Sequence, residues 1–366
     1  MPKNSNWCPD VFKNLYIEPI NRAEINIGPC CQSNHFSVPI KDFNFRTNGD
    51  LQRIRDESLS GVKSPECRRC WQAEKISGMS RRTQVITEYP PDISDDAEIQ
   101  SLDINVTWAC NLACVMCGPK WSSTWAKEVG DIDLADIGRA SLPSNPYMDT
   151  LDINHVRRVH FNGGEPLINH NHTDVLKRLD SKNLLDQLHV SYNTNGTIYP
   201  GKDVIDLWSR AKLVKLYFSI DAIGPQFDYI RYHGDWAQVR DNIARMVREL
   251  PSNVMFGVNL TVGCYNIFEI IDVVDWFDSE LATNREGDPS DFTWNIANGF
   301  DITELNTRAK DAAISRLTSH RYFDGLASAL LEKYQCRDDS WIQHFEEIDQ
   351  RRGTNWRQVL AVANYY

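Results

Sequence analysis

Three cysteines in one short segment constrain this chain more than any other feature of its sequence. Cys110, Cys114 and Cys117 follow one another in the spacing C-x3-C-x2-C. Three thiolates this close in sequence can ligate three corners of one iron–sulfur cube, and no fourth cysteine follows in step, so one iron would be left open. An open position on a metal centre is a place where a ligand can bind and react. The spacing alone also allows a zinc site completed from elsewhere, or a loop with three buried thiols.

Two downstream motifs accompany the cysteines. One is the run Gly163, Gly164 and Glu165, and the other is the pair Ser219 and Asp221. With the three cysteines, these motifs resemble the signature of the radical S-adenosylmethionine (radical SAM) superfamily. The resemblance implies a 4Fe–4S cluster whose open iron chelates the amino and carboxylate groups of S-adenosylmethionine (SAM). It also implies reductive cleavage of SAM to a 5'-deoxyadenosyl radical, which abstracts a hydrogen atom from the substrate.

The same resemblance assigns the SAM-binding residues. It implies that the backbone of Gly163 and Gly164 approaches the methionyl part of SAM, which suits residues without a Cβ atom. Glu165 is expected to accept a hydrogen bond from the SAM ammonium group. The further candidates are side chains for the ribose and carboxylate groups of SAM: Asn195, Ser219, Asp221 and Arg231. For Arg231 the alternative is an ordinary surface ion pair.

A second group of cysteines lies in the first hundred residues. It comprises Cys8, the adjacent Cys30 and Cys31, and the C-x2-C pair Cys67 and Cys70. Four thiolates gathered from three places fit either zinc or a cluster with all four corners taken. Segment 15–27 predicts a hairpin and segment 50–58 a short amphipathic helix. A domain this small would need a metal centre to supplement its core.

This N-terminal run resembles the twitch or truncated SPASM module of radical SAM enzymes. The resemblance implies one auxiliary 4Fe–4S cluster, ligated by Cys8, Cys30, Cys67 and Cys70. We expect Cys30 rather than Cys31 because adjacent cysteines seldom point at one centre and Cys30 directly follows Gly-Pro. Two features depart from the common arrangement: the module precedes the radical SAM domain, and its cysteines are too few for two auxiliary clusters.

A strand–helix rhythm begins near residue 99. The predicted strands are 102–107, 156–162, 188–193, 214–221, 256–262 and 292–297, with helical patterns between most of them. We therefore predict an α/β fold, a partial (β/α)6 radical SAM barrel whose motifs lie at the C-terminal ends of strands. The expected domains are 1–98, the auxiliary cluster domain; 99–298, the partial barrel; and 299–366, a helical C-terminal extension with helices near 308–319, 322–334 and 341–351.

Four of the predicted strands alternate between apolar and polar residues. Parallel strands are usually covered on both faces and apolar throughout, whereas segments 102–107, 188–193, 214–221 and 256–260 each have one more polar face. We expect these faces to line the barrel interior and to meet a polar ligand. The alternative is an antiparallel sheet with one solvated face.

Composition limits the functional classes. The 366 residues carry a net charge of −11, which argues against a large nucleic-acid footprint. No segment approaches 18 consecutive apolar residues and the N-terminus lacks a signal pattern, so we expect a cytoplasmic protein without a membrane span. Ten cysteines in such a chain indicate metal binding or catalysis rather than disulfides.

The substrate is the least constrained feature. The leading hypothesis is a peptide or protein side chain, because auxiliary-cluster modules are common among peptide-maturing relatives. The alternative is a small metabolite such as a nucleotide, sugar or amino acid, which a polar barrel interior suits. A noncatalytic iron–sulfur scaffold or sensor is a third hypothesis. The resemblance also implies an electron donor such as flavodoxin or ferredoxin.

Overall fold

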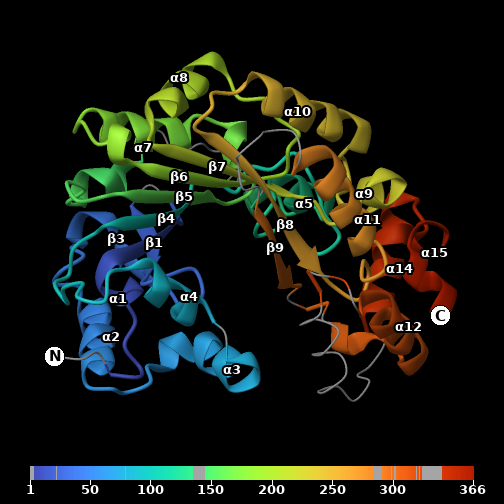
Figure 1. Ribbon diagram of the computed structural model, residues 1–366, viewed down its shortest axis with the longest axis horizontal. Coiled ribbons are helices and arrows are strands. Elements are labelled where there is room, and N and C mark those ends of the chain that lie inside the picture. Colours follow the sequence, from blue (N-terminus) through green and yellow to red (C-terminus); the bar gives the residue numbers. More distant parts are fainter. Residues whose placement is uncertain are drawn as a thin grey trace. The chain divides into compact units, whose positions relative to one another are not determined.

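The computed structural model describes residues 4–21, 23–78, 80–134, 145–282, 291–297, 299–300, 302–318, 320, 322–323 and 340–366. The chain divides into two compact units (Figure 1). Unit 1 comprises Met1–Trp108, Arg139–Tyr192 and Lys202–Val214. Unit 2 comprises Ala109–Gly138, Asn193–Gly201 and Lys215–Tyr366.

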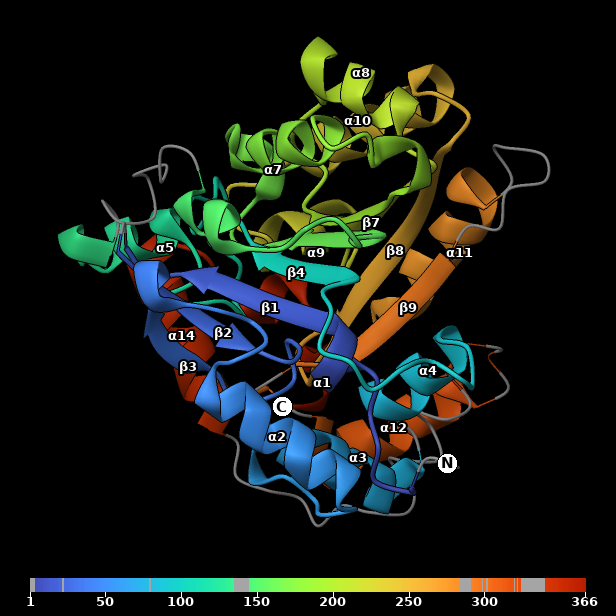
Figure 2. The ribbon, with the colours of Figure 1, turned by 90° about the vertical axis from the view of Figure 1, so that its left-hand side faces the viewer.

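Unit 1 is built on strands in the order β3-β2-β1-β4-β5-β6. The strands are β1 (Asn14–Pro19), β2 (Glu24–Gly28), β3 (Phe36–Pro39), β4 (Ser101–Asn105), β5 (Arg158–Asn162) and β6 (His189–Thr194), which ends two residues beyond the unit. The helices are α1 (Asp10–Lys13), α2 (Gly49–Leu59), α3 (Arg68–Ser77), α4 (Arg81–Glu88), α7 (Asn171–Asp180) and α8 (Lys202–Arg210). Figures 1 and 2 show α7 and α8 on one side of these strands, with α2 and α3 on the other.

The N-terminal segment is part of this sheet. Every residue of β1 is buried. The strand pairs with β2 as an antiparallel hairpin and with β4 in parallel, with Leu15 opposite Leu102. The hairpin predicted for 15–27 is confirmed, as is the helix predicted for 50–58. The first hundred residues therefore gain their core from the shared sheet as well as from a small apolar cluster around Trp7, Phe12 and Ile54.

Unit 2 contains strands in the order β7-β8-β9 and most of the remaining helices. The strands are β7 (Leu213–Ser219, whose first two residues belong to unit 1), β8 (Val254–Val262) and β9 (Asp291–Ile296). The helices are α5 (Ser123–Glu128), α9 (Gly224–Ile230), α10 (Trp236–Glu249), α11 (Ile270–Trp276), α12 (Thr307–Leu317), α14 (Ser340–Arg352) and α15 (Trp356–Val359). Figure 1 shows α9 beside the C-terminal helices α14 and α15.

The strands alternate in burial as they alternate in sequence. In β7, Val214, Leu216 and Phe218 are fully buried, while the residues between them are half-buried. The pairs β4–β5, β5–β6 and β8–β9 are parallel, which excludes the antiparallel alternative for them. The more polar face therefore belongs to parallel strands, as predicted.

The predicted fold class, an α/β partial barrel with a helical C-terminal region, is confirmed. All six predicted strands are present within a few residues of their expected bounds, and α12 and α14 match two of the predicted C-terminal helices. The third, at 322–334, lies almost entirely outside the described residues. Across the described ranges, no helix has the length and apolar character needed to cross a bilayer. The compact units cut across the three expected domains, so that division remains a proposal.

Glu269 makes the stability of unit 2 depend on pH. Its side chain is buried and accepts a hydrogen bond from Ala361 N at 2.7 Å, and burial raises its pKa to about 7. A carboxyl group whose pKa is higher in the folded state stabilises the fold below its unfolded pKa, near 4.5, and this contribution is lost as pH rises through 7.

We expect Glu269→Gln to be more stable than wild type at pH 8 by about 3 kcal/mol, since each pKa unit corresponds to about 1.4 kcal/mol. At pH 4.5 the two proteins should be equal within error. Urea unfolding of both proteins at the two pH values measures the difference. An equal gap at both pH values would contradict the assignment to Glu269.

Candidate functional site

In sequence, the Cys110–Cys117 loop stands between β4 and α5. The loop belongs to unit 2. Cys114 is buried, and Cys110 and Cys117 are half-buried. None of the three forms a disulfide. Burial raises the pKa of Cys114 to about 12, and the positive charge of Arg231 partly offsets this rise. Three cysteines in one loop, with the cation Arg231 beside Cys114, are a donor set that suits a centre with three thiolate ligands. Binding of such a centre would displace the thiol protons.

Arg231 is the cation beside these thiols. Its Nη1 lies 3.9 Å from Cys114 Sγ, and its Nη2 lies 2.6 Å from Asp221 Oδ2. The two side chains are 9% and 0% exposed. Burial lowers the pKa of Arg231, but the nearby Asp221, Cys114 and Tyr265 together outweigh this and the pKa ends above its usual value. Arg231 is thus a buried cation at the cysteine loop, and the alternative of a surface ion pair is wrong.

Asp221 is engaged on both carboxylate oxygens. Oδ1 accepts a hydrogen bond from Thr261 N at 2.8 Å, and Oδ2 faces Arg231. Asn266 Nδ2 also donates to the Asp221 carbonyl oxygen. These contacts hold Asp221 in place to position Arg231, while Ser219 at the end of β7 is half-buried.

Asn195 contacts the cysteine loop through Asn111. Asn195 Nδ2 donates to Asn111 Oδ1 at 3.0 Å, and Asn111 Nδ2 donates to Thr197 Oγ1 at 2.9 Å. The sequence predicts that Asn195 contacts SAM. In the structure, the hydrogen bond from Asn195 to Asn111 also fixes the start of the cysteine loop.

The loop's backbone carbonyls are satisfied by side chains that the sequence analysis missed. Three donors come from the start of α5 and two from α14. The bonds are Thr124 Oγ1 to Cys110 O (2.6 Å), Ser122 Oγ to Leu112 O (2.6 Å), Arg352 Nη2 to Ala113 O (2.8 Å), Trp125 Nε1 to Cys114 O (2.7 Å) and His344 Nε2 to Val115 O (3.2 Å). The hydroxyl-rich segment Ser122–Thr124 directly after the loop was a readable signal for the first of these. No local sequence signal predicted the two side chains from α14, which lie more than 220 residues after the loop.

The Gly-Gly-Glu motif lies in unit 1, directly after β5. Gly163 has φ +124°, and a Cβ atom there would collide with Thr107 O. The neighbouring Gly164 N donates to the same carbonyl at 2.7 Å. Glu165 is fully buried, and its Oε1 accepts from Leu167 N at 3.0 Å. The first glycine is therefore required by a close backbone crossing as well as by its φ angle.

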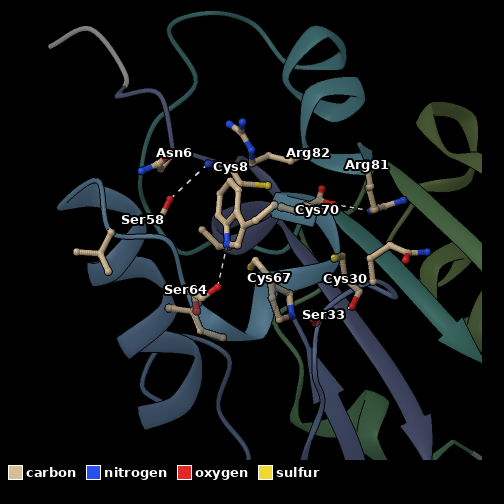
Figure 3. Close-up of a pocket in the computed structure, with 17 residues that line it drawn as sticks. Asn6, Cys8, Cys30, Ser33, Ser58, Ser64, Cys67, Cys70, Arg81 and Arg82 are labelled. Carbon is tan, nitrogen blue, oxygen red and sulfur yellow. Dashed lines mark hydrogen bonds and ion pairs between the residues drawn. The ribbon is translucent and has the colours of Figure 1, made fainter. Parts of the chain in front are cut away.

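Four of the N-terminal cysteines line a small recess in unit 1 (Figure 3). The thiol-bearing residues at its wall are Cys8, Cys30, Cys67 and Cys70. Cys31 is not among the lining residues. Burial raises its pKa, and the nearby Asp103 carboxylate adds to the rise. The structure thus places Cys30, and not its neighbour, with the other three cysteines.

Two arginines also line this recess (Figure 3). Arg81 Nε donates to the buried Asp10 Oδ2 at 2.8 Å. Arg82 is held by two hydrogen bonds to Glu74, of 2.8 and 2.6 Å. Within the described ranges, no three His, Cys, Asp or Glu side chains converge on a point that would hold a single metal ion.

We expect Gly163→Ala to destabilise unit 1 by about 3 kcal/mol, because an L side chain is strained at this φ and its Cβ meets Thr107 O. Gly49→Ala is the matched control, since a Cβ atom at that residue would meet nothing within 4 Å and its φ is not positive. Urea unfolding of both variants measures the effect. Equal stability of the two variants would show that the close crossing at Gly163 is not strained.

Comparison with known proteins supplies the family. Residues 104–277 match the family model described as the Radical SAM superfamily. A GTP 3',8-cyclase of Desulforamulus reducens is 28% identical over 127 residues, covering 35% of this chain and 36% of the relative. A GTP 3',8-cyclase of Sulfurimonas denitrificans is 22% identical over 263 residues, covering 68% and 72%. The match thus spans little more than a third of the first relative's length.

Two solved structures were also found. SuiB of Streptococcus suis bound to S-adenosylmethionine has a TM-score of 0.39 at 10% identity, covering 95% of this chain and 75% of that one. Native anSMEcpe with bound AdoMet has a TM-score of 0.40 at 17% identity, covering 63% and 62%. The family uses a 4Fe–4S cluster and SAM, which agrees with the chemistry implied by the cysteine loop. Residues 104–277 of this chain therefore form a domain that matches the radical SAM superfamily.

Proposed function

We propose that this chain reductively cleaves SAM at a 4Fe–4S cluster held by Cys110, Cys114 and Cys117. The observation that carries the proposal is a buried cation, Arg231, set beside a loop of three cysteines within a domain that matches the radical SAM family. When bound, the cluster would supply the electron for reductive cleavage of the SAM sulfonium, which would give a 5'-deoxyadenosyl radical for hydrogen abstraction from the substrate.

The residues of unit 2 prepare the loop for an anionic centre. The positive charge of Arg231 favours the thiolate form of Cys114, which burial alone disfavours. Asp221 holds Arg231 in that position, and Asn195 orients the start of the loop. In this proposal Arg231 is also the group available to the SAM carboxylate, and Ser219 to the ribose.

The Gly-Gly-Glu motif is proposed for the methionyl end of SAM. The backbone of Gly163 and Gly164 approaches it, and Glu165 accepts from its ammonium group. The crossing at Thr107 supports this role, because it fixes the Gly-Gly backbone in one conformation. The buried Glu165 carboxyl is likewise fixed by its bond to Leu167 N.

The recess in unit 1 is the proposed site of one auxiliary 4Fe–4S cluster, held by Cys8, Cys30, Cys67 and Cys70 in a module similar to twitch or truncated SPASM domains. Two observations support it. The four cysteines line one recess, and Arg81 and Arg82 place two positive charges beside them. Four thiolates with a cluster would carry net negative charge, which these cations offset.

The comparisons favour a small metabolite as the substrate. The related sequences found are named GTP 3',8-cyclase, and they support the alternative predicted from the polar strand faces. We therefore propose a polar small molecule such as a nucleotide, with a peptide side chain as the competing hypothesis. A low-potential protein such as flavodoxin or ferredoxin is the proposed electron donor.

Single cysteine substitutions test the two-site assignment after anaerobic reconstitution with iron and sulfide. We expect Cys114→Ala to lose all 5'-deoxyadenosine formation with SAM and dithionite, while it retains about four irons per chain at the N-terminal site. Cys67→Ala should retain basal SAM cleavage. Cys31→Ala is the matched control and should retain both iron and activity.

Iron analysis and chromatography of 5'-deoxyadenosine give both readouts. Complete loss of iron from Cys114→Ala would contradict two independent sites. Absence of basal SAM cleavage in Cys67→Ala would contradict the assignment of cleavage to the Cys110–Cys117 loop alone.

A further inference from the structure

We propose that helix α14 is a structural part of the cluster site, with Arg352 as the positioning residue that holds the Cys110–Cys117 loop closed. The inference rests on the proposed function, in which this loop holds a 4Fe–4S cluster. The inference assigns a role to the C-terminal helical region, because Arg352 lies about 240 residues after the loop residue Ala113 that it contacts.

Arg352 is held by four neighbours within unit 2. Its Nη2 donates to Ala113 O at 2.8 Å, and its Nε lies 3.0 and 3.2 Å from the two carboxylate oxygens of Glu128. The guanidinium carbon lies 4.8 Å from the ring centroid of Trp125 and 4.3 Å from that of Tyr232. Only 2% of the side chain is exposed. Such a guanidinium acts as a fixed donor rather than as a surface charge.

Ala113 is held from both sides of its peptide. Its N–H donates to Tyr232 O at 2.9 Å, while its carbonyl accepts from Arg352. Val115 repeats the pattern: its N–H donates to Ile230 O at 2.8 Å, and its carbonyl lies 3.2 Å from His344 Nε2. Because a carbonyl only accepts, His344 must carry its proton on Nε2. The two residues that flank Cys114 are thus clamped between the end of α9 and α14.

Asp349 ties the same helix to α9. Its Oδ1 accepts from Tyr229 OH at 3.0 Å, and its Oδ2 accepts from Trp356 N at 2.6 Å. Since Tyr229 stands two residues before Arg231, α14 contacts both the loop that carries Cys114 and the segment that carries its cation. The geometry therefore assigns α14 the role of fixing the cysteine loop and the end of α9 relative to each other.

Removal of a charged donor from a buried carbonyl leaves that carbonyl without its partner, which is costly. The loop can relieve the cost only by moving, and movement of Ala113 displaces the adjacent Cys114. We therefore expect Arg352→Met to release iron from this site about tenfold faster than wild type, a factor typical for loss of one such hydrogen bond.

The test uses the full-length reconstituted protein and follows iron transfer to a colorimetric chelator without oxygen. The phase that is missing in Cys114→Ala reports the loop cluster, and the remaining phase reports unit 1. Arg352→Met should accelerate the first phase and leave the second unchanged, and it should broaden the electron paramagnetic resonance signal of the reduced loop cluster. Arg352→Lys should give an intermediate rate, because it keeps the charge near Glu128 but not the planar fork.

Arg357→Met is the control, since this exposed arginine of α15 forms an ion pair with the exposed Glu346 and its substitution removes the same charge. Release rates for Arg352→Met within twofold of wild type would overturn the inference. If that variant does not fold, His344→Leu decides in its place, with several-fold faster release expected and an unchanged rate contradicting it. A wild-type protein that holds no cluster in the loop would instead refute the proposed function.

Discussion

The backbone of the Cys110–Cys117 loop is the element on which the arrangement of unit 2 depends. Buried backbone groups require hydrogen-bond partners. Here the start of α5 and helix α14 donate to the loop's carbonyls, and carbonyls at the end of α9 accept from its N–H groups. These hydrogen bonds hold the three segments against the loop and fix the loop's backbone. The three cysteines are therefore carried on a backbone that is already fixed.

Charge is arranged in the same way at both cysteine sites. In unit 2 the buried Arg231 lies beside Cys114 and is fixed by Asp221. In unit 1 Arg81 and Arg82 line the recess of Cys8 and its partners, and are fixed by Asp10 and Glu74. An arginine–carboxylate pair removed from water is costly to desolvate. Such a pair is buried at Arg231 and partly buried at Arg81 and Arg82, which is consistent with a negatively charged centre at each site.

Much of the fold follows from local pattern, because strand alternation and helix periodicity depend on neighbouring residues. The strand at 102–107, the helix from Trp236 and the Gly-Gly-Glu turn were all predictable in this way. Parallel pairing of β1 with β4 was not, because no local signal links segments about 87 residues apart. For the same reason, the contacts of Arg352 and His344 with the cysteine loop could not be predicted. The ion pair between Asp221 and Arg231 was also not predictable, because a separation of ten residues in sequence does not determine whether two side chains meet.

Iron counting on the anaerobically reconstituted wild-type protein, combined with detection of 5'-deoxyadenosine after addition of SAM and a strong reductant, tests the two cysteine sites together. We predict about eight irons per chain, four at each site, together with formation of 5'-deoxyadenosine. About four irons with one zinc would leave SAM cleavage in place and make the N-terminal centre a structural metal site. Intact clusters without any 5'-deoxyadenosine would contradict the assignment of SAM cleavage to this chain, and would favour an iron–sulfur scaffold or sensor.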